Sequence, residues 1–218
     1  PIPPSRPASG LLTAIVTNNT DDEKMGRVRI KFPTIADDQE AFWAPVVSVG
    51  AGATRGLMVI PEVNDEVLVG FVNGDFDRPY VLGGLWNGSD APPNATAVAD
   101  GKVEIREWTS RVGHTVRLTD KSGEEKIEVI DKTGKNLLKI DTAKNTVSIL
   151  AEQDIKLEAK GNIELKAANI KLEATAKVSV DGSQVQAEAK SQIALKGAMA
   201  ELSASGITKI SGSMVNIN

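Results

Sequence analysis

The chain of 218 residues is long enough for one compact domain and one extended domain, and its net charge of −4 argues against a nucleic-acid scaffold, which is usually basic. It has no cysteine, so no disulfide stabilises it and no thiol nucleophile is available. No apolar run approaches the roughly 18–20 residues of a membrane-spanning helix, and the first residues lack a signal-peptide core. We therefore expect a protein that is soluble when it is made.

The first ninety residues contain six short stretches rich in valine and isoleucine, at 11–17, 27–32, 42–49, 57–60, 66–72 and 80–82. Each has the length and composition of a β-strand, and turn-forming residues separate one from the next. No long helical pattern interrupts them. Five or six short strands in a region rich in aromatic residues predict an OB-fold barrel over residues 11–90. We expect an extended lead-in at 1–10 and a polar linker at 91–102.

A short repeat runs from Ala151 to the end of the chain. Pairs of apolar residues open at 155, 163, 170, 178, 185 and 193, less regularly near 200 and 207, and again at 215, with a mean spacing of 7.5. Alternation of apolar and polar residues within each unit predicts short strands with one buried face, and glycine-containing segments between them predict turns. The predicted buried face consists of Ile155, Leu157, Ile163, Leu165, Ile170, Leu172, Val178, Val180, Val185, Ile193 and Leu195.

The repeat has too little apolar surface to fold as a separate single chain. No aromatic residue follows Trp108 and no proline follows Pro93, so its interior must be narrow and aliphatic. Two buried aliphatic side chains contribute roughly 3–6 kcal/mol per unit, whereas ordering the backbone costs about 1–2 kcal/mol for each residue of the unit. Three copies around one axis would bury the aliphatic faces and pair most strand edges. We therefore predict that residues 103–218 form an intertwined homotrimeric triangular β-helix, or prism.

Two other architectures compete for this segment. Alanine, lysine, glutamate and leucine also favour helices, so an amphipathic helix or coiled coil is one alternative. The aliphatic positions scatter around a helical wheel, however, whereas they share one side of strands separated by turns. A single-chain left-handed β-helix of the acyltransferase type is the other alternative, but it repeats every six residues. The spacing of 7.5 residues favours the trimeric prism.

Several longer motifs resemble a known family. They are GRVRIKFP at 26–33, FWAPV at 42–46, GLMVIPEVNDEVLVGF at 56–71 and NGDFDRPYVLGGLWNG at 73–88. In this order they closely resemble the OB-fold of VgrG-type spike proteins, a family that includes the central spikes of contractile phage tails, type VI secretion systems and extracellular contractile injection systems. GHTVRLTD at 113–120 and DKTG at 131–134 resemble the start of the family's trimeric β-helix.

The resemblance implies a mechanical function. The chain is expected to be a structural spike at the tip of a contractile injection apparatus, with the barrel as a collar and residues 103–218 as a needle that pierces the target envelope. We expect hub or baseplate proteins at the N-terminal end, with residues 1–10 leading in from a removed hub domain. Such a protein is made in the bacterial cytoplasm without a signal peptide, joins a phage-tail-like particle and is delivered outward on contraction.

The C-terminal end is a candidate binding site. Three copies of Val215 and Ile217 would leave a small apolar triangle with unpaired backbone groups, a surface suited to a partner. The family resemblance implies that this partner is a PAAR-type tip protein. Its site is expected at Met214, Val215, Asn216, Ile217 and Asn218.

Neither an enzyme nor a cofactor or metal site is predicted. His114 is the sole histidine, so a Ser-His-Asp arrangement would depend on it alone, and a structural role for it is favoured over a metal site built by three symmetry copies. The carboxylates fall on alternating solvent-facing positions or in turns, unlike the paired carboxylates of a glycosidase. No phosphate-binding glycine loop precedes a helix.

A second function remains in competition with the spike. In it the barrel binds oligosaccharide or single-stranded nucleic acid, and the prism serves only as a trimerisation stalk. Single-strand binding requires a basic groove with exposed aromatics, which the negative net charge disfavours. Phage, type VI and extracellular particles share the motifs above, so the sequence does not choose among these systems or identify a cargo.

Overall fold

The computed structural model describes residues 10–35 and 40–216. The chain divides into two units, residues 1–156 and residues 157–218, which are described separately below. The only helical segment in the described part is a single 3₁₀ turn, Val72–Gly74. No helix among the described residues is long and apolar enough to cross a membrane.

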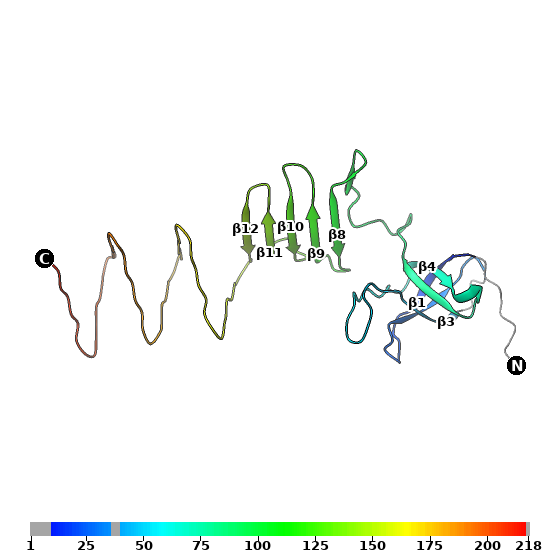
Figure 1. Cartoon of the computed structure of the whole chain (residues 1–218), viewed down its shortest axis with the longest axis horizontal. Coiled ribbons are helices and arrows are strands. Elements are labelled where there is room, and N and C mark those ends of the chain that lie inside the picture. The colour runs from blue at the N-terminus through cyan, green and yellow to red at the C-terminus, as the bar shows by residue number, and fades with distance from the viewer. Residues whose placement is uncertain (1–9, 36–39, 217–218) are drawn as a thin grey trace. The chain divides into compact units, whose positions relative to one another are not determined.

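The first unit begins with a five-stranded antiparallel sheet that curls into a barrel (Figure 1). Its strands are β1 (Leu12–Asn18), β2 (Arg27–Lys31), β3 (Glu40–Pro45), β4 (Glu66–Phe71) and β5 (Pro79–Gly84), in the order β3-β2-β1-β4-β5. Val46, just after β3, forms a parallel bridge with Val81 in β5, and the Val47 N–H donates to the Val81 carbonyl at 2.8 Å. This bridge brings the two edge strands together and nearly closes the barrel, which confirms the predicted OB fold.

The barrel core follows from alternation along the strands. Every second residue of β1, β2 and β4 points inward, and nine apolar side chains are at most 3% exposed: Ala14, Val16, Val28, Ile30, Phe32, Ala44, Val67, Val69 and Val81. Phe32 packs beside Phe71 and Phe76, with ring centroids 5.8 and 5.0 Å away. The strands are therefore held by a small core made mostly of valine, with Phe32 packed against two partly buried phenylalanines.

The strand predicted at 57–60 is wrong, and the strands predicted at 27–32, 42–49 and 66–72 end earlier, at Lys31, Pro45 and Phe71. Residues 57–60 form no strand: the Leu57 N–H donates to the Val49 carbonyl at 3.0 Å, but no ladder continues from there. Gly52 and Arg55 exchange two backbone hydrogen bonds, and residues 49–59 form an exposed arm outside the sheet. Met58 at its side is 82% exposed. The apolar residues at 57–59 resemble a buried strand in sequence but are exposed, whereas Ile60 packs against the barrel core.

A second antiparallel sheet follows within the same unit. After a hairpin of β6 (Val98–Ala99) and β7 (Lys102–Val103), five strands pair in chain order: β8 (Ile105–Thr109), β9 (Thr115–Thr119), β10 (Lys126–Ile130), β11 (Leu137–Asp141) and β12 (Thr146–Leu150). Each pair keeps an unbroken register over five residues. The residues at 105–150 therefore pair within one chain. The domain boundaries expected at 10, 90 and 102 stay predictions.

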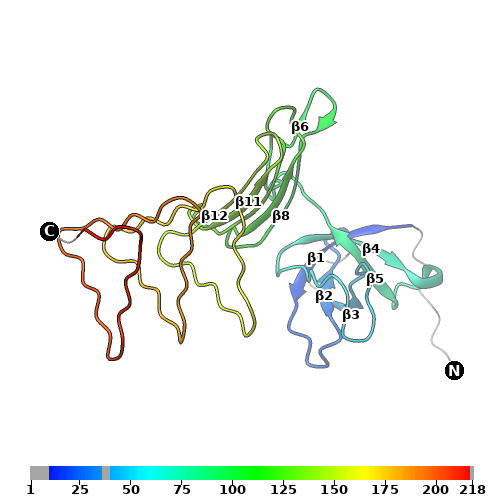
Figure 2. The same ribbon diagram turned by 60° about the vertical axis from the view of Figure 1, so that its left-hand side comes forward.

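The second unit has no paired strands. Its described residues, 157–216, run in extended stretches joined by bends, and Figures 1 and 2 show this part of the chain turning widely back and forth. The bends lie at 160–161, 168, 175–176, 182–183, 190–191, 198, 205–206 and 213, which are seven or eight residues apart. The bends thus recur with the same spacing as the apolar pairs.

Candidate interaction surfaces

One face of the sheet β8–β12 is apolar and uncovered. The strand register places nine residues together on this face, each between 38 and 68% exposed: Trp108, Val116, Leu118, Ile127, Val129, Leu138, Ile140, Val147 and Ile149. We call this set the apolar sheet face. It hollows into an open cavity of about 670 Å³ that includes Trp108 and Leu138. A continuous apolar surface of this kind marks a site of interaction.

The opposite face of the same sheet carries a row of alternating charges. Glu107, Arg117, Glu128 and Lys139 lie directly opposite one another on four successive strands. Arg117 Nε lies 2.6 Å from Glu107 Oε2, and the Glu107 side chain is only 5% exposed. Opposite charges on facing residues stabilise a sheet, so this row favours the observed register.

The predicted trimer-core residues share a common pattern in the second unit and its border. All eleven, from Ile155 to Leu195, are between 54 and 87% exposed in the single chain. The first residue of each pair is less exposed than the second, as Ile163 at 55% and Leu165 at 65% illustrate. One chain does not bring these side chains together into a core, and their burial by other copies stays a prediction.

The predicted tip site is only partly described. Met214 is 79% exposed, Val215 is 49% exposed, and Asn216 is exposed as well. Ile217 and Asn218 lie outside the described residues. Binding of a tip protein at this end therefore stays a prediction.

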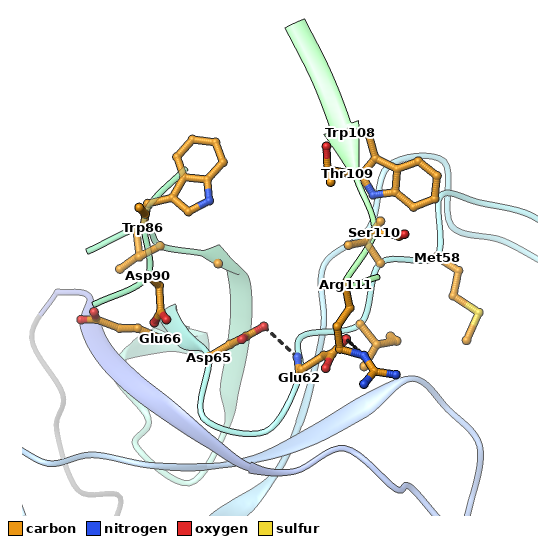
Figure 3. A pocket seen from close by; sticks show the side chains of 15 residues that line it. Met58, Glu62, Asp65, Glu66, Trp86, Asp90, Trp108, Thr109, Ser110 and Arg111 are labelled. Atoms are coloured by element: carbon orange, nitrogen blue, oxygen red, sulfur yellow. Dashed lines mark hydrogen bonds and ion pairs between the residues drawn. The ribbon is translucent and has the colours of Figure 1, made fainter. Parts of the chain in front are cut away.

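Sequence reasoning missed a groove of about 750 Å³ between the barrel and strand β8. Figure 3 shows Trp86 and Trp108 on opposite sides of it, where they are 70 and 59% exposed. Arg111 reaches Glu62 with 3.1 Å between Nε and Oε1. The two tryptophans are twenty-two residues apart in the sequence, and only their exposure identifies them as a pair.

The acidic side chains of this groove have structural partners. Asp65 Oδ2 accepts a hydrogen bond from the Glu62 N–H at 2.8 Å. Asn87 Nδ2 donates to Glu66 at 2.7 Å and to Asp90 at 3.3 Å. These carboxylates therefore hold the surrounding loops in place.

Two aspartates elsewhere have strongly perturbed ionisation. Asp21, in the turn between β1 and β2, accepts hydrogen bonds from Arg27 Nε and Nη2 at 3.0 and 2.7 Å, and these bonds hold its pKa well below the usual range. Asp131, in the turn between β10 and β11, accepts from Asn136 Nδ2 at 2.9 Å and from Thr133, which lowers its pKa in the same way. Both carboxylates are ionised structural links within turns.

The only histidine also has a structural contact. His114, in the turn between β8 and β9, accepts a hydrogen bond on Nδ1 from the Lys132 N–H at 3.2 Å. Among the described residues, no group of three histidine or acidic side chains is arranged to hold a metal ion.

Comparison with known proteins agrees with the fold. Residues 12–86 match the family of the type VI secretion system/phage-baseplate injector OB domain. This range spans all five strands of the barrel.

The relatives extend the similarity beyond the barrel. The chain is 33% identical over 131 residues to the type VI secretion system spike protein VgrG4b of Pseudomonas aeruginosa, covering 55% of this chain and 16% of that protein. It is 29% identical over 157 residues to the spike protein VgrG1a of the same species, covering 66% of this chain and 24% of that protein. It is also 30% identical over 111 residues to the actin cross-linking toxin VgrG1 of Vibrio cholerae, covering 48% of this chain and 10% of that protein.

These matches confirm the resemblance to VgrG-type spike proteins. The chain spans less than a quarter of the length of each of these relatives.

Proposed function

We propose that this chain forms the collar and needle of a homotrimeric spike in a contractile injection apparatus. The observation that carries the proposal is the combination of an injector OB domain with two regions that one chain leaves incomplete. The first is the apolar sheet face, and the second is the unpaired repeat at 157–216. In both regions, apolar side chains or backbone groups that one chain leaves exposed would be covered by further copies of the chain.

Three copies satisfy the needs of both regions. Around a threefold axis, three apolar sheet faces meet at the centre, and side chains such as Val129 and Ile140 become buried away from water. Further along the chain, the extended segments of one copy pair with those of the other two, so that backbone groups left free in one chain gain hydrogen bonds. The result is the intertwined triangular prism with an aliphatic interior.

The mechanical role follows from this architecture. A narrow prism with paired edges and a continuous aliphatic core transmits force along its axis, which suits a needle that pierces a target envelope when a sheath contracts. Hub or baseplate proteins adjoin the barrel end, and a PAAR-type tip protein binds the exposed end at Met214 and Val215. In this role the chain is structural rather than enzymatic, and it leaves the cell as part of a phage-tail-like particle.

The oligomeric mass tests this function directly. Light scattering after size exclusion is expected to give three times 23.1 kDa, and the mass should resist dilution. The double variant Leu138→Asp and Ile149→Asp places two carboxylates on the apolar sheet face, where the residues are directly opposite each other. It should yield the 23.1 kDa monomer, because burying these charges at the centre of a trimer is unfavourable.

The matched control is Ser148→Asp, which adds the same charge to β12 on the opposite face, beside Lys139. It should remain trimeric. A monomeric unmodified chain would overturn the proposed spike. A trimer that tolerates the double variant would show instead that the apolar sheet face is not the interface.

A further inference from the structure

The alternation of bends in the second unit reveals a repeat longer than 7.5 residues. Gly182, Gly197 and Gly212 recur every fifteen residues, and a Cβ at each would lie 3.5, 3.1 and 3.3 Å from a carbonyl oxygen two residues further on. At the intervening bends, Gly161 and Gly206 have nothing within 4 Å. Ala159, Ala174, Ala189 and Ala204 keep the same spacing of fifteen. Two kinds of bend therefore alternate, and one repeat contains two extended segments.

These bends keep consecutive segments apart. Among residues 157–216, the described part of this unit, no strand pairs with another, so both edges of each segment are open to a further strand. Parallel pairing of two consecutive segments within a chain requires a connection of a dozen or more residues, which these bends do not supply. Strands that run parallel to these segments would therefore come from other copies.

The apolar pairs determine how such copies align. On a symmetric axis, a segment of one copy lies beside the next segment of another copy, and the two run in the same direction. Aliphatic residues stack on aliphatic residues when one pair lies beside another, for example Ile163 and Leu165 beside Ile170 and Leu172 of the partner subunit, because a shift of one residue would turn one set outward.

In this alignment the outward charges of successive segments oppose one another. The residue between the apolar pair is Lys156, Glu164 and Lys171 in the first three segments, and the residue after the pair is Glu158, Lys166 and Glu173. Both series alternate in sign. At the position after the pair, the alternation stops at Glu173, Asp181 and Glu188, which are all acidic, and Glu188 is then followed by Lys196. At the position between the pair, Glu201 is followed by Lys209 in the next segment.

The structure supports a shared outer face for these charges. Lys171 and Glu173, two residues apart, form an ion pair while both side chains are largely exposed. Residues two apart in an extended segment point to the same side, opposite the aliphatic pair. The charged residues thus lie where neighbouring copies can meet along the edges of the segments.

We propose that these charges form an ion-pair ladder between copies, in which Glu164 lies beside Lys171 of the partner subunit and Lys166 lies beside Glu173 of the partner subunit. This inference rests on the proposed trimer, and it concerns the interaction that fixes the axial register of the three copies. The aliphatic pairs determine which side of each segment faces the core. The alternating charges determine which segment of the neighbouring copy lies beside it. Facing charges of opposite sign stabilise adjacent strands, and like charges oppose the wrong pairing.

Cysteine cross-linking tests the ladder in a chain that has no native cysteine. In the full chain, Glu164→Cys combined with Lys171→Cys should oxidise to a covalent trimer on a non-reducing denaturing gel, because adjacent strands lie within disulfide reach. The control pair, Glu164→Cys with Ser179→Cys, should remain unlinked, since two strand spacings of roughly 9.6 Å exceed that reach.

The outcomes separate the ladder from the trimer. A disulfide within single chains would show that segments fold back on themselves, and linkage of the control pair would show a different register; either result overturns the ladder. Light scattering of the unoxidised variants reports independently whether the trimer exists. A trimer without the expected cross-link therefore refutes only the ladder, whereas a monomer refutes the proposed function as well.

A charge swap gives a second measurement that needs no cross-link. Glu201 and Lys209 have uncharged neighbours in the adjoining segments, Ala194 and Asn216, so their pair can be reversed alone. Glu201→Lys should lower the thermal midpoint of the trimer at low salt, and adding Lys209→Glu should restore it. Failure of the second change to restore the midpoint would contradict the pairing.

Discussion

The sheet β8–β12 and residues 157–216 are built from similar short segments of alternating apolar and polar residues, yet the first pairs with itself and the second does not. The difference lies in their turns. Every turn of the sheet contains a residue with positive φ: Gly113 at +96°, Gly123 at +79°, Gly134 at +73° and Asn145 at +54°. Among the described residues 157–216 none has positive φ, and even the glycines avoid that region. In the sheet β8–β12, left-handed turn residues reverse the chain so that consecutive strands pair. The described residues 157–216 lack such turns, so their segments do not pair with each other.

The largest effect is expected from the barrel core and should leave the other two regions intact. Phe32 is 3% exposed and packs on two other phenylalanines, so Phe32→Ala should cost about 3–5 kcal/mol of barrel stability. Thermal unfolding followed by tryptophan fluorescence and circular dichroism measures this loss. The oligomeric mass should not change. Tyr80→Ala, at a side chain that is 39% exposed, is the control. Dissociation caused by Phe32→Ala would show that barrel and needle are not independent.

A smaller effect separates the two kinds of turn. Gly134→Ala forces a Cβ into the left-handed region and should cost about 1–2 kcal/mol, although nothing lies within 4 Å to obstruct it. Gly161→Ala makes the same change in open space without positive φ and should be close to neutral. Denaturant unfolding of the two variants side by side measures the difference. Equal losses would refute the role assigned to turn chemistry.

Acid should weaken the first unit through its two structural aspartates. In the folded state the pKa values of Asp21 and Asp131 are held far below the ordinary value of about 3.9, so the unfolded chain binds more protons at low pH. Their contribution is complete above the ordinary pKa and is lost as pH falls toward the folded values. Unfolding midpoints measured between pH 6 and pH 2 should decrease, and less steeply for Asp21→Asn. An unchanged slope in that variant would contradict this assignment.

The smallest effect concerns the charged row of the sheet. Lys139→Glu places a like charge opposite Glu128 and should cost roughly 0.2–1 kcal/mol. High salt should reduce this loss only in part, because Glu128 is 7% exposed and salt screens buried charges less than exposed ones. Denaturant midpoints at low and high salt measure both quantities. A loss that is independent of salt would indicate a packing effect instead of a charge effect.

Much of the barrel was predictable because its signals are local. Valine-rich alternation marked β1, β2 and β4, and the motifs at 26–33 and 73–88 indicated the OB fold. The arm at 49–59 was not predictable, because an apolar run has the same composition whether it is buried or projects from the surface. Its position depends on the Gly52–Arg55 turn and on the bridge between Val46 and Val81, which are tertiary features.

The sequence indicated that apolar faces of short strands would form interaction surfaces, but it did not show how the strands would pair or where the surfaces would lie. Alternation in the repeat identified residues such as Ile163 and Leu165 as one face, and the structure leaves that face open. The hairpin pairing of residues 105–150 was missed, although Gly123 and the DKTG turn at 131–134 are signals of chain reversal. The groove between Trp86 and Trp108 depends on how the barrel and β8 meet, and no pattern along the chain records that.

The unpaired backbone of residues 157–216 also has a consequence for quality control. A protease binds its substrate as an extended strand, and a lone copy of this chain offers many segments in that form, with lysine residues such as Lys166 and Lys190 exposed among them. A completed spike would offer none, because its strands are already occupied. Degradation would then remove copies that have not assembled, because the open strand edges that allow assembly also make an unassembled copy a protease substrate.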